Sequence, residues 1–160
     1  MRQVRKEYSS DLQQLAAMRL FVREACQALW GPAASEDAIN ELELAVDEAT
    51  SNIIRHAYAC EQGRPIELRV EGDADQAIVS LYHCGRDFDH TAVAPPTFKG
   101  QEGGFGIYLI QRLVDEVTYL HNDQGRRREL STAGLERALS FSWDASAAIL
   151  WSLYRELLAQ

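Results

Sequence analysis

The sequence predicts an α+β fold, in which helices lie before and after a central antiparallel hairpin. Two helical patterns come first, because residues 12–29 carry apolar side chains at helical spacing and a second pattern runs from Ser35 to about Tyr58. Two apolar, β-branched stretches, 65–71 and 77–82, then flank a turn-rich segment, as in a β-hairpin. This order favours helices packed on a sheet over a doubly wound sheet.

Local signals set the ends of these two helices. Gly31 and Pro32 are helix breakers and end the first one. Ser35 is followed by Glu36 and Asp37, which is typical of a helix start, because serine caps the first turn and acids there suit the positive end of the helix dipole.

The remaining elements follow from the same periodicities. Three arginines at 126–128 are interpreted as a solvated turn. Further strands are expected over 2–8, 117–121 and 139–143, and further helices over 104–114 and 144–160.

The charge balance excludes some partners. The chain of 160 residues has 16 basic and 24 acidic side chains, a formal net charge of −8. This surplus of acid disfavours a broad electrostatic contact with nucleic acid or an anionic membrane. The N-terminus is charged and lacks the apolar stretch of a signal peptide, and no run is long enough to span a membrane. We therefore expect a cytoplasmic protein without a direct nucleic-acid or membrane partner.

Cysteine and histidine spacing gives no metal or hydrolase signature. The three cysteines are far apart and form no CxxC pattern, so reduced thiols are expected. The four histidines lack metal-ligand spacing such as HExxH, and no Ser/His/Asp order stands out.

The second helix carries the first chemical signal. Glu48 and Asn52 are four residues apart and therefore share one flank, beside an apolar stripe. An amide oxygen can bind Mg²⁺ and a carboxylate can take up a proton from an attacking hydroxyl, so the pair suits phosphoryl transfer. The alternative is a solvated helix surface, where such pairs are common.

The second signal is the glycine-rich segment 103–106, which leads into an apolar helical run. Backbone amides at such a helix start can bind phosphate oxygens, because glycine has no Cβ in the way. The alternative is a flexible hinge at the end of a loop. The segment does not follow a strand, which disfavours a dinucleotide-binding fold.

Two ordered motifs resemble those of a known family. Residues 41–58, ELELAVDEATSNIIRHAY, resemble the N-box of the anti-sigma serine kinases of the RsbW and SpoIIAB type. Residues 103–109, GGFGIYL, with the segment 111–119, resemble the second glycine box and following strand of that family. The resemblance covers roughly 11–121. It implies the histidine-kinase-like (GHKL) ATPase fold, a two-layer α/β sandwich with helices on one face of a mixed, mainly antiparallel sheet.

The resemblance implies ATP and Mg²⁺ as cofactors. Glu48 takes the position of the catalytic base, and Asn52 that of the magnesium ligand. We expect an ATPase domain over 1–143. The C-terminal part departs from the family pattern, and its apolar residues predict a helix over 144–160 that packs on the same domain, with packing on a partner as the alternative. The implied nucleotide-binding residues are Asn52, His83, Gly85, Gly103, Gly104, Phe105 and Gly106.

The first glycine box departs from the family pattern. Residues 83–89 read HCGRDFD, with His83 where the family has an acid that binds the adenine amine and Asp87 where it has a second glycine. A neutral histidine can accept a hydrogen bond through one ring nitrogen. His83 is therefore interpreted either as a nucleotide contact or as a strand-end residue facing solvent.

Two functions remain open at this point. By resemblance, the chain is an ATP-dependent serine/threonine protein kinase and anti-sigma regulator. It would switch between a STAS-domain anti-anti-sigma protein and a sigma factor, as a homodimer. The alternative is a non-catalytic anti-sigma protein that binds a nucleotide or a partner through a degenerate ATP site.

Overall fold

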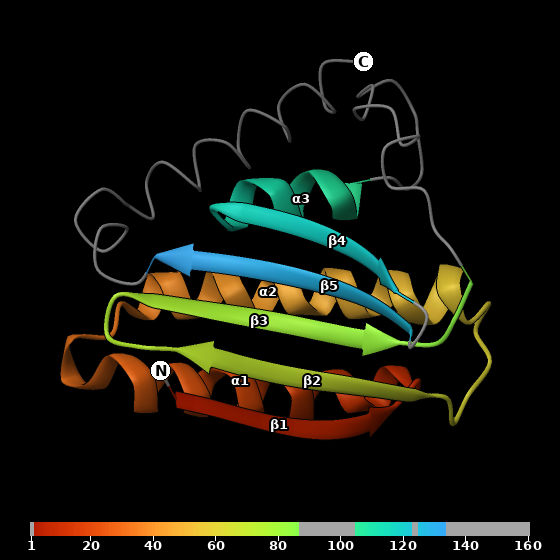
Figure 1. Cartoon of the computed structure of the whole chain (residues 1–160), viewed down its shortest axis with the longest axis horizontal. Helices are drawn as coiled ribbons and strands as arrows, with labels where there is room; N and C mark the ends of the chain where they lie inside the picture. The colour runs from red at the N-terminus through yellow and green to blue at the C-terminus, as the bar shows by residue number, and fades with distance from the viewer. Residues whose placement is uncertain (1, 87–104, 123–124, 134–160) are drawn as a thin grey trace, which may run out of the picture.

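Five strands form one sheet, and every described strand pair is antiparallel. The computed structural model describes residues 2–86, 105–122 and 125–133. The strand order across the sheet is β1-β2-β3-β5-β4 (Figure 1). The strands are β1 (Arg2–Ser9), β2 (Pro65–Gly72), β3 (Gln76–His83), β4 (Glu116–Asn122) and β5 (Gly125–Ala133).

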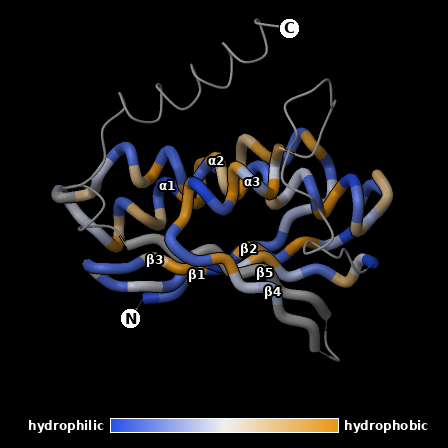
Figure 2. Tube along the Cα trace, turned by 90° about the horizontal axis from the view of Figure 1, so that it is seen from above, coloured by the Kyte–Doolittle hydropathy of each residue, from blue (hydrophilic) through white to orange (hydrophobic). Residues whose placement is uncertain are grey.

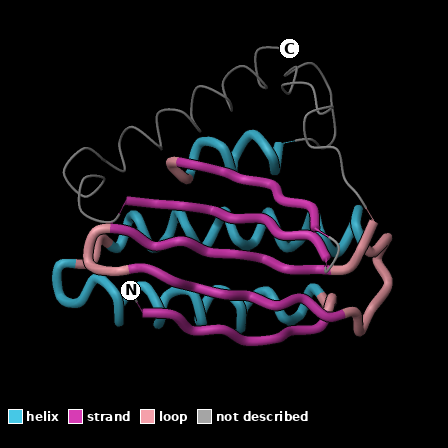
Figure 3. The backbone as a smooth tube through the Cα atoms, viewed as in Figure 1, coloured by secondary structure: helices cyan, strands magenta, loops and turns pink. Residues whose placement is uncertain are grey.

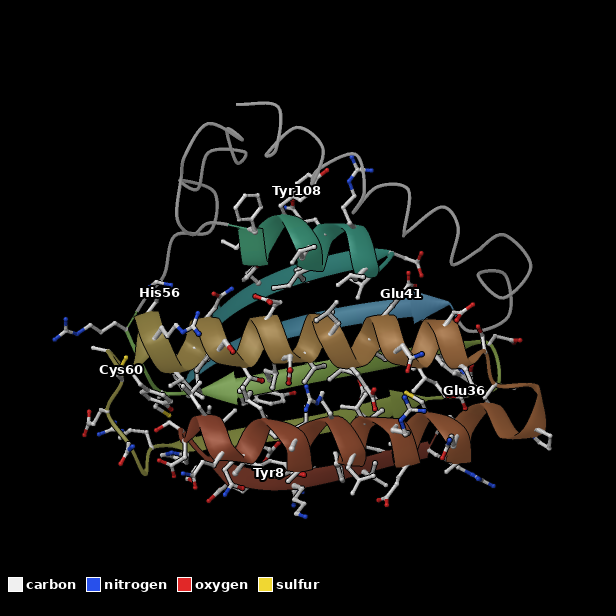
Figure 4. All side chains as sticks on the ribbon, turned by 180° about the vertical axis from the view of Figure 1, so that it is seen from behind. Tyr8, Glu36, Glu41, His56, Cys60 and Tyr108 are labelled. Carbon is white, nitrogen blue, oxygen red and sulfur yellow. The ribbon has the colours of Figure 1, made fainter. Side chains whose placement is uncertain are left out.

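The helices lie together on one face of this sheet (Figure 2). They are α1 (Leu15–Trp30), α2 (Glu36–Asn52) and α3 (Phe105–Leu113), and α2 continues directly into a π-helical turn, Ile53–Ala57. Seen from the helix side, α2 lies between α1 and α3 (Figure 4). The predicted α+β sandwich is therefore confirmed, as are the two N-terminal helices and the central hairpin.

The core forms where the apolar faces of the helices meet alternate residues of the strands. On α2, Ile39, Leu42 and Val46 are fully buried, at the spacing that places side chains on one helix face. The strands bury every second residue against them, because successive side chains point to opposite sheet faces. The buried strand residues include Ile66, Leu68, Val70, Ala77, Val79 and Leu81.

The expected turn at residues 126–128 was wrong. These arginines belong to β5, which pairs with β3 on one side and β4 on the other. Arg127, for example, lies opposite Tyr82 of β3. Strand pairing of this kind depends on partners distant in sequence, which a local run of charge does not reveal. The strand and helix expected over 139–143 and 144–160 lie outside the described residues.

The two ends of β3 lie in different surroundings. At its start, a tight turn joins it to β2, where Asp73 Oδ1 accepts hydrogen bonds from the backbone N–H groups of Asp75 and Gln76 at 3.1 and 3.2 Å. At its other end, β3 leads into a loop (Figure 3), and Gly85 in this loop lies against Ala57 of the π-helical turn. The candidate site lies at this second end.

Candidate active site

The helix α2 is fixed at its start and presents Glu48 and Asn52 near its end. Ser35 caps it, since its Oγ accepts a hydrogen bond from the backbone N–H of Ala38 at 3.3 Å. The apolar stripe that faces the sheet fixes the rotation of the helix about its axis. That rotation turns the flank carrying Glu48 and Asn52 toward α3, the helix that packs beside it.

Gly106, in the first turn of α3, lies directly against these two side chains. A Cβ added at Gly106 would be 2.7 Å from Glu48 Oε2 and 3.4 Å from Asn52 Nδ2. No larger residue fits there unless Glu48 moves. The first N–H groups of α3 lack partners within the helix, and such groups bind anionic oxygens. The fold therefore brings a carboxylate, an amide and a helix N-terminus to one place.

This arrangement brings together four of the residues singled out from the sequence, namely Glu48, Asn52, Phe105 and Gly106. Phe105 is the first residue of α3 and is half-buried. Gly103 and Gly104 lie outside the described residues. The pairing of α2 with α3 joins segments about fifty positions apart in the sequence.

The amide of Asn52 is one of the buried polar groups on α2 that lack a partner among the described residues. Its Nδ2 is buried and makes no hydrogen bond within the part of the chain that the structure describes. Burying an amide without a hydrogen-bond partner costs about 1–3 kcal/mol, so this side chain lowers the stability of the fold. Such a group at the start of α3 fits a site that a ligand completes.

A π-helical turn follows Asn52 and directs the chain toward β3. Single π-helical turns are rare and occur often at functional sites. At its end, the carbonyl oxygen of Ala57 accepts a hydrogen bond from Arg86 N at 2.8 Å. A Cβ on Gly85 would be 2.7 Å from that same oxygen, so only glycine allows this close approach.

Tyr58 is a site residue that the sequence reasoning did not single out. Its hydroxyl donates to the Pro65 carbonyl at 2.6 Å and accepts from the backbone N–H of Cys84 at 3.0 Å. Burial raises the pKa of this hydroxyl, which keeps it a donor. Tyr58 thus joins the end of α2 to β2 and β3. Its only sequence signal was its place as the last residue of the 41–58 motif.

Contacts with Gly85 and Tyr58 help to hold His83 at this end. Its Nδ1 accepts a hydrogen bond from Gly85 N at 3.2 Å, and its ring meets that of Tyr58 edge-on, with 5.9 Å between the centroids. His83 and Gly85 therefore lie near Ala57 and Tyr58, whereas Glu48, Asn52 and Gly106 form the other part of the site. The π-helical turn connects the two parts.

The residues present fit a magnesium–nucleotide complex better than a metal held by protein alone. Across the three described stretches, no three His, Cys, Asp or Glu side chains gather as a metal site would require. Mg²⁺ commonly takes one or two protein oxygens, substrate phosphates and water. Asn52 could supply one oxygen, and the N–H groups that open α3 could hold the phosphates.

Comparison with known proteins identifies the class. A family model described as "Histidine kinase-like ATPase domain" matches residues 8–131. This is most of the chain, and the protein belongs to that family.

Within this class, curated proteins similar to this chain include serine-protein kinases named RsbW. The RsbW of Oceanobacillus iheyensis is 30% identical over 100 residues, which cover 57% of this chain and 63% of that protein. The RsbW of Bacillus velezensis is 35% identical over 95 residues, covering 54% and 59%. The matches thus span about three-fifths of the length of these relatives.

Solved structures agree on the fold. The RsbU and RsbW domains of a Mycobacterium tuberculosis protein give a TM-score of 0.58 at 18% identity, covering 82% of this chain and 32% of that one. A histidine kinase domain from Erythrobacter litoralis gives a TM-score of 0.51 at 18% identity, covering 78% and 62%. No helix in the described part of the chain has the length and apolar character needed to cross a membrane.

Proposed function

We propose that this chain is an ATP-dependent serine/threonine protein kinase and an anti-sigma regulator. The contact of Gly106 with both Glu48 and Asn52 supports this proposal most directly. It brings a proton acceptor and a metal-binding oxygen to a helix start suited to phosphate. Phosphoryl transfer requires these groups, because its catalysis is mostly positioning and charge stabilisation.

Each group has a separate role in the proposal. Glu48 would accept the proton of the substrate hydroxyl as it attacks the terminal phosphate of ATP, and ADP would leave as the bond between its β-phosphate and the transferred phosphate breaks. Asn52 Oδ1 would hold Mg²⁺, which would neutralise charge on the phosphates. The N–H groups at the start of α3 orient the phosphates, and the hydrogen at Gly106 leaves room for Glu48 beside them.

The protein partners belong to the proposal as well. The relatives' name, serine-protein kinase, supports a protein substrate. We propose that this substrate is a STAS-domain anti-anti-sigma protein, and that the chain, as a homodimer in the cytoplasm, alternatively holds a sigma factor. Partner switching requires that the nucleotide state change the relative affinity for the two partners.

The test is transfer of labelled γ-phosphate from Mg-ATP to a purified STAS-domain protein from the same cell. Glu48→Gln keeps the size of the side chain and removes its ability to take a proton. We expect transfer to fall by about 10²- to 10⁴-fold, with ADP affinity within threefold of the parent chain. Glu24→Gln, the same change at an exposed position of α1, is the matched control and should leave transfer unchanged.

Three other outcomes would count against the proposal. Full transfer by Glu48→Gln would remove Glu48 as the base. Nucleotide binding by the parent chain without any transfer would favour the alternative, a non-catalytic anti-sigma protein. Partner capture without nucleotide binding would favour the same alternative, with a degenerate ATP site.

A further inference from the structure

The segment that follows β3, residues 84–86, is attached to the end of the π-helical turn by hydrogen bonds at both of its ends. The backbone N–H of Cys84 donates to the Tyr58 hydroxyl at 3.0 Å. The backbone N–H of Arg86 donates to the Ala57 carbonyl at 2.8 Å. The position of this segment therefore depends on two successive residues, Ala57 and Tyr58, and one of these two contacts is made by a side chain.

The Tyr58 side chain is itself held in place. Tyr58 is only 4% exposed, and its hydroxyl donates to the Pro65 carbonyl at 2.6 Å. A hydroxyl has one proton, so the bond to Pro65 leaves its lone pairs to accept from Cys84. The Arg64 guanidinium lies over the ring, 5.5 Å from its centroid. A phenylalanine ring would fill the same space and leave the Cys84 N–H without this partner.

The segment lies at the distance that the far end of a nucleotide reaches. In the proposed function, the phosphates lie at the start of α3, beside Asn52. From Asn52 to Ala57 the chain advances roughly 6–8 Å along the helix axis, and Gly85 packs against Ala57. A nucleotide directed from α3 toward β3 therefore brings its ribose and base to residues 84–86.

We infer, on the basis of the proposed nucleotide binding, that Tyr58 is a positioning residue, whose hydroxyl holds residues 84–86 where they contact the ribose and base. The hydroxyl lies away from the reacting groups, since Glu48 and Asn52 form the other part of the site. A binding segment that is in place for only a fraction of the time weakens the apparent affinity by that fraction. Tyr58 thus sets the affinity for nucleotide and leaves the rate of the chemical step unchanged.

The test is Tyr58→Phe in the full chain, with calorimetry of Mg-ADP binding and phosphate transfer over a range of ATP concentrations. We expect the dissociation constant for ADP and the KM for ATP to rise about tenfold, as when the segment is in place for one-tenth of the time. The kcat should stay within twofold. Unchanged ADP affinity in Tyr58→Phe would overturn the inference and leave the proposed function intact.

Tyr8→Phe is the matched control for lost stability. Tyr8 is 5% exposed, and its hydroxyl donates to the Ala17 carbonyl of α1 at 3.3 Å. This variant removes a buried tyrosine hydroxyl from β1, two strands away from β3. It should lower the free energy of unfolding and keep ADP affinity within threefold of the parent chain. Equal weakening of ADP binding by both variants would overturn the inference, because lost stability alone would then explain it.

A measurement on the parent chain covers the case in which Tyr58→Phe does not fold. Cys84 is an exposed residue, so its bond to the Tyr58 hydroxyl is what protects its amide from hydrogen exchange. We expect this amide to exchange at least tenfold more slowly with Mg-ADP bound than without it. Exchange at the rate of an unbonded amide in the ADP complex would overturn the inference. Absence of ADP binding by the parent chain would overturn the proposed function together with the inference.

Discussion

The two flanks of α2 differ in the hydrogen bonds that their polar side chains make, although Asp47, which binds Arg19 of α1, also keeps one buried oxygen without a partner among the described residues. On the flank facing α1, Arg23 of α1 binds three side chains of α2. On the flank facing α3, Glu48 and Asn52 lie against Gly106, and the Asn52 amide nitrogen has no partner. Both flanks belong to one helix with one buried stripe, so packing alone does not explain the difference.

The Arg23 cluster consists of Arg23 and the three side chains of α2 to which its guanidinium donates hydrogen bonds. The guanidinium donates two hydrogen bonds to Glu43, at 2.8 and 3.0 Å, one to Glu36 at 2.7 Å and one to Asn40 at 2.5 Å. The bonds to Glu43 and Glu36 raise the pKa of Arg23 above its ordinary value. A planar guanidinium that binds a carboxylate through two nitrogens gives strong, directional bonds.

The polar groups around Arg23 therefore stabilise the fold, whereas Glu48 and Asn52 on the other flank are kept for a ligand. Polar side chains that satisfy one another stabilise the contact between α1 and α2. A buried amide left without a partner lowers stability, which is expected where a site is completed only by what it binds. Variants on the two flanks should therefore affect different properties.

The largest effect is expected from Asn52→Ala. It removes the proposed magnesium ligand, and Mg-dependent phosphate transfer should fall by about 100-fold or more. It also removes a buried amide without a partner, whose cost of about 1–3 kcal/mol offsets the packing lost with the side chain, so the free energy of unfolding should not fall by more than about 0.5 kcal/mol. Urea unfolding and transfer assays on the same preparation check both parts. A large loss of stability would show that Asn52 is structural and is not kept for a ligand.

A smaller and opposite effect is expected from Arg23→Met, which retains the apolar stem. Loss of the cluster should lower the free energy of unfolding by about 1–2 kcal/mol, because the side chains are partly exposed and solvent screens them. Nucleotide affinity should remain within threefold of the parent chain. Denaturant unfolding and ADP calorimetry test this, and a loss of ADP binding equal to that of Asn52→Ala would contradict it.

A third effect is a pH dependence beside the Arg23 cluster. Burial raises the pKa of the Cys26 thiol from 9.0 to about 12, with a smaller contribution from Glu43. The unfolded chain thus loses this proton first, and stability falls as pH rises between about 9 and 12, by up to about 1.4 kcal/mol per pH unit.

Cys26→Ala should flatten this part of the pH profile, although it lowers stability at neutral pH by removing buried sulfur. Unfolding free energies of both chains at pH 8 and pH 10 give the slopes. The Cys60→Ala variant, at an exposed cysteine, should keep the slope of the parent chain. Equal slopes for parent and Cys26→Ala would show that the thiol does not titrate as its burial requires.

Part of the fold and site could be predicted from the sequence because the signals are local. The helical stripe of α2, the cap at Ser35 and the hairpin of β2 and β3 each lie within a few residues of one another in the chain. The spacing of the apolar residues in the helix and the strands indicates directly which side becomes buried. For the same reason, the shared flank of Glu48 and Asn52 could be predicted before their neighbours were known.

The rest could not be predicted, because it depends on pairings between distant segments. The arginine run of β5 was interpreted as a turn, since its strand character comes from β3 and β4 on either side. The role of Tyr58 was missed because its hydrogen-bond partners are Pro65, the first residue of β2, and Cys84, just after the end of β3.

The sequence by itself determined the layers of this protein and the residue types of its site. Periodicity, capping and turn chemistry are properties of short segments, so they fix helices and hairpins wherever those segments lie. Only the tertiary structure decided that Gly106 lies against Glu48, so close that a Cβ added to the glycine would be 2.7 Å from Glu48 Oε2. It also decided which nitrogen of His83 accepts from Gly85. Such contacts follow from the packing of whole elements, and the close packing of a protein interior sets them to within fractions of an ångström.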